Sequence, residues 1–145
     1  MSFIPHALAS GAFAALASVF AKLFTDSRTT YFTQILIDLL PVTQQDALKS
    51  YILLLVRLIC FLLIFACNSL MWTIFTKALN RAPSSTSVSV VNSAANFGVS
   101  ALAGYAVFGE PLAYSWWLGA ALIITGTLLL TRSQTNGSMN KSKVE

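Results

Sequence analysis

The sequence has little charge and few of the side chains that carry chemistry in water. Of its 145 residues, 10% are charged, and it contains five carboxylates, two cysteines and one histidine. With 56% hydrophobic residues and a mean hydropathy of +0.71, the chain has too little polar surface to cover a water-soluble globule of its size. The composition therefore indicates a membrane protein.

Sequence motifs for catalysis are missing as well. No HExxH, GxSxG or Walker-type loop is present, and no predicted helix carries a pair of carboxylates. We therefore expect no enzyme, no catalytic residue, no bound metal and no cofactor. The net charge of +4 comes from nine Lys and Arg residues scattered along loop ends, which fits membrane anchoring and not nucleic-acid binding.

The two cysteines do not predict a disulfide. Cys60 and Cys67 lie seven residues apart on one apolar stretch, so that in a helix their backbones stand about 10 Å apart, beyond the reach of a disulfide. We interpret both as small buried hydrophobic residues.

Four apolar stretches dominate the chain. A helix needs about 20 apolar residues to cross a hydrocarbon core of roughly 30 Å, and the predicted spans cover residues 4–24, 55–77, 86–108 and 112–130. The predicted fold is an all-α, polytopic membrane protein with four transmembrane helices in one domain, residues 1–130. The polar tail of residues 131–145 is expected to be disordered.

Local signals indicate where these spans begin and end. The connection of residues 25–50 contains the apolar run YFTQILIDLLP, too short to span, so we expect an interfacial helix or a short re-entrant segment. Thr43 followed by Asp46 resembles a capping box that starts the second span. Gly109 is expected to end the third span, and Pro111 to occupy the first turn of the fourth.

Polar residues inside a span are expensive, so they are the informative ones. One row recurs at three- and four-residue steps along the third span, namely Ser85, Ser89, Asn92, Asn96 and Ser100. The row predicts either the lining of a substrate path or interhelical hydrogen bonds worth about 1 kcal/mol or less each. Asn68, in the second span, is the expected partner of Asn92 or Asn96. The candidate pathway residues are Asn68, Ser89, Asn92, Asn96 and Ser100.

Small residues at helical spacing predict close helix packing. Gly11 and Ala15 lie four residues apart in the first span, and Gly119 and Gly126 lie two turns apart in the fourth. Such residues let helix backbones approach closely in a membrane. The sequence leaves open whether the helices belong to one chain or to two.

Ionisable residues stand at the predicted ends of the spans. Glu110 is interpreted either as an anion that stabilises the start of the following helix or as a coupling carboxylate. His6, Lys22 and Arg57 are expected to extend toward the membrane interfaces.

The charges give a weak orientation signal. Four spans put both termini on one side, which carries five cations against four on the other, and this favours cytosolic termini. The last five residues, 141–145, read K-x-K-x-x and resemble a retrieval signal of endoplasmic-reticulum membrane proteins, although a solvated tail is the alternative. Sequons at Asn136 and Asn140 would be usable only in the lumen.

Residues 83–130 resemble the final helix pair of EamA-type members of the drug/metabolite transporter superfamily. The matching residues are Phe108, Gly109, Glu110, Trp117, Gly119, Ile123 and Gly126. The resemblance implies half of an EamA-type transporter repeat architecture and the dimeric habit of the four-span small multidrug resistance proteins. In that group a glutamate of the first helix couples protons to substrate, but no acidic residue lies between His6 and Lys22 here.

Two functions follow as expectations. Many secondary transporters need two repeats around a midplane site, and four helices supply one. We therefore expect a homodimer in the lipid bilayer that carries an unknown small-molecule substrate. The alternative is a non-transporting scaffold or accessory subunit, in which the polar row binds another membrane protein.

Overall fold

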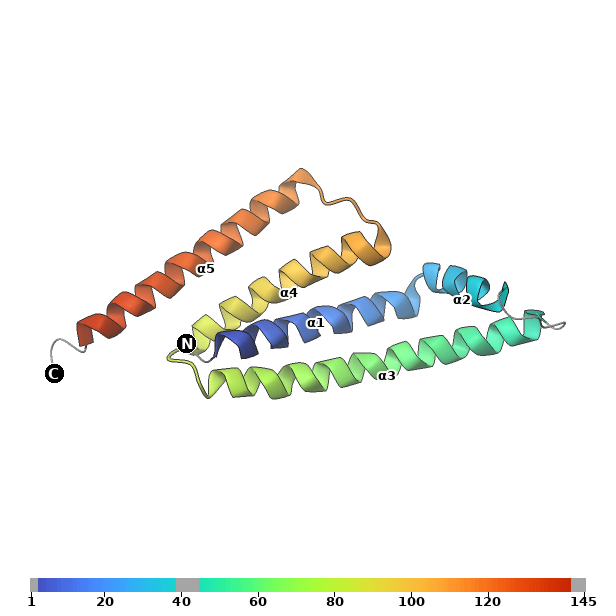
Figure 1. The fold of residues 1–145 in the computed structure, drawn as a ribbon, viewed down its shortest axis with the longest axis horizontal. Helices are drawn as coiled ribbons and strands as arrows, with labels where there is room; N and C mark the ends of the chain where they lie inside the picture. Colours follow the sequence, from blue (N-terminus) through green and yellow to red (C-terminus); the bar gives the residue numbers. More distant parts are fainter. Residues whose placement is uncertain (1–2, 39–44, 142–145) are drawn as a thin grey trace.

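The computed structural model describes residues 3–38 and 45–141, and within those ranges the chain is helical, without strands (Figure 1). The helices, in chain order, are α1 (Ile4–Thr25), α2 (Arg28–Asp38), α3 (Gln45–Leu79), α4 (Ser85–Phe108) and α5 (Tyr114–Lys141). Pro5 lies in the first turn of α1, where the missing N–H costs no hydrogen bond.

Three of these helices are long and apolar enough to cross a membrane. They are α1, the Lys49–Leu79 part of α3, and α4, and they coincide with the first three predicted spans. The apolar part of α5, Tyr114–Leu130, falls short of the 18 residues that mark a spanning helix. The chain is thus an all-helical protein compatible with an integral membrane location.

Helix α1 forms the centre of the bundle, because it packs against α3 on one side and α4 on the other (Figure 1). At its amino-terminal end a buried cluster joins all three helices, formed by Ala7, Ala78, Val88 and Val91. Lipid tails are as apolar as these side chains, so association in a membrane depends on close packing, which small residues permit.

Where an interfacial helix or a short re-entrant segment was expected within residues 25–50, the structure has the 11-residue helix α2. It continues past the end of α1 and lies along the amino-terminal part of α3 (Figure 1). Thr29, Thr33 and Ile37 are buried in this arrangement, and the Thr33 hydroxyl donates to the Thr29 carbonyl at 2.8 Å. The capping box predicted at Thr43 lies outside the described residues.

The turn after α4 needs a glycine because its backbone adopts a positive φ. Gly109 has φ 59° and ψ 28°, a left-handed conformation that side chains strain, and its N–H donates back to the last turn of α4. This confirms the predicted end. The prediction for Pro111 was wrong, because α5 begins only at Tyr114. Residues 109–113 form a non-helical link between α4 and α5 (Figure 1).

Helix α5 packs against α4 alone among the described elements. The contact is held near the turn by Phe97 and Trp116, whose rings stack with centroids 5.4 Å apart and planes 6° apart. The helix continues to Lys141, so residues 131–141 are helical in the structure, and the disorder of this polar tail stays a prediction. That segment contains no proline, and a helix already nucleated extends at little cost. Residues 142–145, which hold most of the K-x-K-x-x pattern, lie outside the described residues.

Candidate functional site

Helices α1 and α4 cross closely at Gly11. A Cβ atom placed on Gly11 would stand 2.3 Å from the Asn92 carbonyl oxygen, 2.7 Å from the Ala95 Cβ and 2.9 Å from the Asn96 nitrogen. Only glycine fits there. Ala15, one turn further along α1, is fully buried, so the two candidate packing residues of α1 both lie inside the bundle.

A part-buried hydrogen bond joins the two helices beside this crossing. Ser10 is fully buried, and its hydroxyl lies 2.5 Å from the Asn92 Oδ1 and 3.0 Å from the Ala7 carbonyl oxygen. The partner of Asn92 is therefore a serine of α1, which the sequence reasoning missed. The available signal was the position of Ser10 beside Gly11, on the small-residue face of the first span.

Asn68 does not make the predicted pairing. Its Nδ2 donates to the Ile64 carbonyl at 2.9 Å, within α3. The physical reason is that α1 lies between α3 and α4, so Ser10 reaches the Asn92 amide first. Asn96 accepts a hydrogen bond from the Ser100 hydroxyl at 3.2 Å, one turn further along α4.

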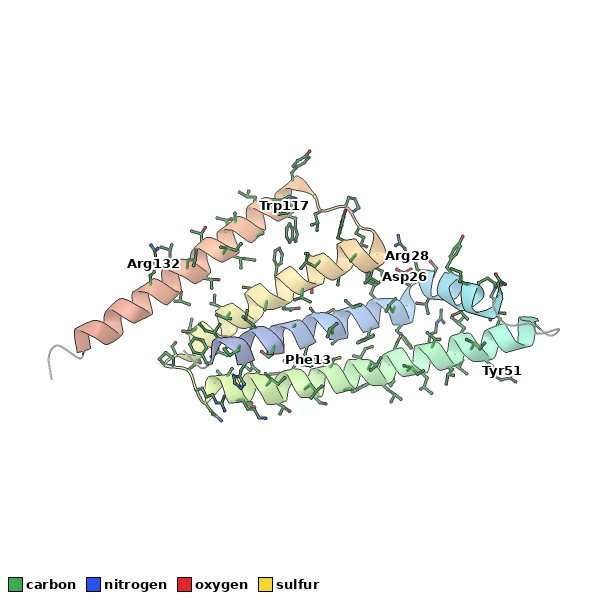
Figure 2. The ribbon with its side chains drawn as sticks, in the orientation of Figure 1. Phe13, Asp26, Arg28, Tyr51, Trp117 and Arg132 are labelled. Carbon is green, nitrogen blue, oxygen red and sulfur yellow. The ribbon has the colours of Figure 1, made fainter. Side chains whose placement is uncertain are left out.

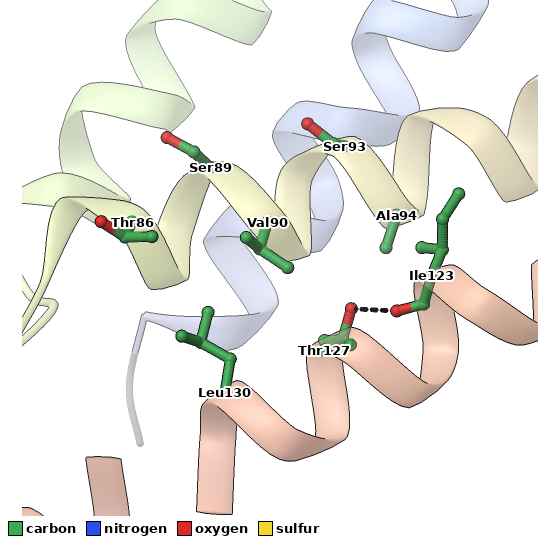
Figure 3. Close-up of a pocket in the computed structure, with 9 residues that line it drawn as sticks. Thr86, Ser89, Val90, Ser93, Ala94, Ile123, Thr127 and Leu130 are labelled. Carbon is green, nitrogen blue, oxygen red and sulfur yellow. Dashed lines mark hydrogen bonds between the residues drawn. The ribbon is translucent and has the colours of Figure 1, made fainter. Parts of the chain in front are cut away.

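Ser89 belongs to a different surface, an open groove between α4 and α5 with a volume of about 490 Å³. Figure 3 shows Val90 and Ala94 of α4 facing Ile123, Thr127 and Leu130 of α5. Its lining residues are Thr86, Ser89, Val90, Ser93, Ala94, Ile123, Gly126, Thr127 and Leu130. The five-residue polar row therefore divides between two faces of α4.

The glycines of α5 make no close contact inside this chain. A Cβ atom placed on Gly119 or on Gly126 would meet nothing within 4 Å among the described residues. In the part of the chain that the structure describes, no other helix packs closely at these two positions.

The carboxyl-terminal ends of α1 and α4 are joined by an ion pair between Lys22 Nζ and Glu110 Oε1. The Lys22 ammonium also stands 4.3 Å from the centre of the Phe108 ring, a cation–π arrangement. Sequence reasoning treated Lys22 and Glu110 separately. The signal that pairs them is that the predicted spans put both at the same side of the membrane.

Two cavities meet at this ion pair. The smaller, of about 170 Å³, lies between α1 and α4, and its polar lining consists of Ser18, Lys22, Ser100 and Glu110. The larger, of about 390 Å³, shares Ser100, Gly104 and Glu110 with the first and extends to Trp116. The Glu110 carboxylate therefore borders both cavities. We call the α1–α4 interface from Ser10 and Asn92 to the ion pair the polar seam; its members are Ser10, Asn92, Asn96, Ser100, Lys22 and Glu110.

Two other ionisable residues, His6 and Arg81, lie away from the polar seam. His6 and Arg81 meet at the opposite end of the bundle, with His6 Nε2 and Arg81 Nη1 3.0 Å apart. The Arg57 Nε is buried and has no hydrogen-bond partner in the described part of the chain. This atom therefore does not reach water, although the side chain was expected to extend toward the interface. Cys60 and Cys67 are free and buried, which confirms their interpretation. Within the described residues no group of three His, Cys, Asp or Glu side chains is placed to hold a metal ion.

No family model matches this chain, and no solved structure matches it. The fold defines its class, a helical protein with three helices of membrane-spanning length. Its function has to be argued from the polar seam and from the groove between α4 and α5.

Proposed function

We propose that the chain is one half of a small-solute transporter of the drug/metabolite transporter type, with a homodimer as the working unit. The observation that carries the proposal is the polar seam, in which a part-buried Ser10–Asn92 hydrogen bond and the Lys22–Glu110 ion pair lie along one helix interface. Polar and ionisable groups among apolar helices are costly and commonly mark the paths of solutes.

The proposal includes α5 as a fourth span. Its apolar part, Tyr114–Leu130, is about 25 Å long at 1.5 Å per residue, and a bilayer thins locally to match a slightly short helix. Trp117 at one end and Arg132 at the other, both exposed, are residues that anchor helices at the two interfaces (Figure 2).

The dimer is supported by the surfaces that the single chain leaves uncovered. Gly119 and Gly126 have open space around them, and the groove between α4 and α5 has room for side chains of another helix. A second copy would also supply the second repeat that alternating access requires. We further propose an endoplasmic-reticulum or other endomembrane location, on the K-x-K-x-x pattern of residues 141–145.

The same groove supports the rival function, a scaffold or accessory subunit. Ser89 stands at the rim of the groove, away from the polar seam, where it could contact another membrane protein. In this case the seam would only hold α1 against α4, and no solute would pass.

The test measures release of labelled solutes from proteoliposomes that contain the full chain. The vesicles are loaded separately with glycine, taurine, choline and glucose. A transporter releases at least one of them, and Asn96→Leu slows that release while dimer content stays unchanged. The matched control is Asn68→Leu, since Asn68 bonds only within its own helix. If no solute leaves faster than from empty vesicles, and Ser89→Leu detaches a co-purified membrane protein, the scaffold function replaces transport.

A further inference from the structure

The ends of α1 and α4 bring four charged groups of both signs together. Besides Lys22 and Glu110, the cluster contains Arg28, whose Nη1 lies 3.7 Å from the position of a Cβ on Gly109. It also contains Asp26, whose Oδ1 accepts the Arg28 backbone N–H at 2.8 Å. Figure 2 shows Asp26 and Arg28 beside the turn that follows α4. Two cations and two anions leave the cluster without net charge.

The ion pair is accessible and easily opened. The Lys22 side chain is 38% exposed and the Glu110 side chain 56%, and a pair exposed to this degree contributes little to stability because solvent screens it. It stands at the border of two cavities of about 170 and 390 Å³. A ligand that replaces each partner therefore loses little by separating Lys22 from Glu110.

A ligand that separates Lys22 from Glu110 has to supply a new partner for each of them, and this requirement defines the class of ligand. A simple anion that bound Lys22 would leave the Glu110 carboxylate beside it without a partner, and a simple cation would do the same to the Lys22 ammonium. A molecule with both charges satisfies both groups, since its anionic end takes Lys22 and its ammonium end takes Glu110. The Phe108 ring, 4.3 Å from the Lys22 ammonium, and the Ser18 and Ser100 hydroxyls line the same cavity.

We propose that the cavity at the Lys22–Glu110 pair binds a zwitterion, meaning an ammonium group and an anionic oxygen group carried on one small molecule or on one lipid headgroup. The Arg28 guanidinium beside Gly109 provides a second cation for the anionic end. Where the source is a free solute, the inference names the substrate class and so rests on the proposed function; where the source is a phosphatidylethanolamine headgroup, it is independent of transport.

The experiment measures binding without flux. The full chain is purified in a nonionic detergent, and its thermal midpoint is followed by the reaction of a fluorescent maleimide with Cys60 and Cys67, which are buried until the bundle opens. Glycine and taurine are compared with acetate and methylammonium at equal ionic strength. A second arm compares nanodiscs of phosphatidylcholine with and without phosphatidylethanolamine, and counts retained lipids by native mass spectrometry.

We expect glycine or taurine, or retention of phosphatidylethanolamine, to raise the midpoint, and the singly charged ions to leave it unchanged. Lys22→Met and Glu110→Gln each weaken the effect at least tenfold. The double exchange Lys22→Glu with Glu110→Lys keeps it, because a zwitterion can turn round in the cavity. Lys77→Met, at the other end of the bundle, serves as the matched control and changes nothing.

The inference is overturned if acetate or methylammonium has the same effect as glycine, or if zwitterion binding survives Lys22→Met. Failure of every zwitterion and of phosphatidylethanolamine overturns it too. Zwitterion binding without solute release would leave this site standing and remove the transport proposal. Release of glucose without any zwitterion binding would leave the transport proposal standing and remove this site.

Discussion

Replacement of Gly11 by alanine tests whether the α1–α4 crossing is as close as the structure has it. The added Cβ would stand 2.3 Å from the Asn92 carbonyl oxygen, where ordinary contact begins at 3.4 Å, so α1 has to retreat by about 1 Å at this point. The opposing oxygen and the Asn96 nitrogen belong to the α4 backbone, which cannot move aside as a flexible side chain would.

The magnitude follows from two opposing terms. Overpacking in a close contact costs about 1–3 kcal/mol, and alanine gains up to about 1 kcal/mol over glycine in a helix. The retreat of α1 also stretches the neighbouring Ser10–Asn92 hydrogen bond, now 2.5 Å. We therefore expect Gly11→Ala to destabilise the bundle by about 1–2 kcal/mol.

The assay is reversible unfolding of the full chain in mixed micelles, followed by circular dichroism as the fraction of denaturing detergent rises. The matched control is Gly98→Ala in α4, because a Cβ on Gly98 would meet nothing within 4 Å in the described structure. Its stability should stay unchanged or rise. Equal stability of the Gly11→Ala and Gly98→Ala variants would refute the close crossing.

Three further predictions concern α5, the turn and α3. Trp116→Ala removes the stack with Phe97, so spin labels on α4 and α5 should report a broader distance distribution; an unchanged distribution would show that the turn alone sets the position of α5. Gly109→Ala forces a side chain into φ 59° at a cost of about 1–2 kcal/mol, visible as a lower unfolding midpoint, and an unchanged midpoint would contradict the left-handed turn. Cys60 and Cys67 should react with a membrane-permeant maleimide at least tenfold more slowly than in denaturing detergent, and similar rates would place them outside the α1–α3 contact.

The polar residues of α4 show what the spacing of residues within one helix can predict and what it cannot. The prediction treated the polar residues of α4 as one stripe that lines a path or bonds to a neighbouring helix. In the structure Asn92 meets α1, and Ser89 borders the groove toward α5. The periodicity of a single helix says that residues share a side; it contains no information on which neighbour comes to that side.

The membrane character, the first three spans and the end of α4 were determined by the sequence alone. Hydropathy decides them, because the thickness of the bilayer sets the length of a span, and Gly109 decides the end of α4 because few other residues adopt a positive φ. These are local properties, and each can be read from neighbouring residues.

Only the tertiary structure decided which helices meet. The central place of α1, the Ser10–Asn92 hydrogen bond and the Lys22–Glu110 pair join residues 82 and 88 positions apart, and no local pattern distinguishes these partners from others. The physical reason is that lipid offers apolar surfaces the same environment as another helix does. The choice of neighbour therefore depends on shape and on the few polar groups that need each other, and both exist only once the helices are assembled.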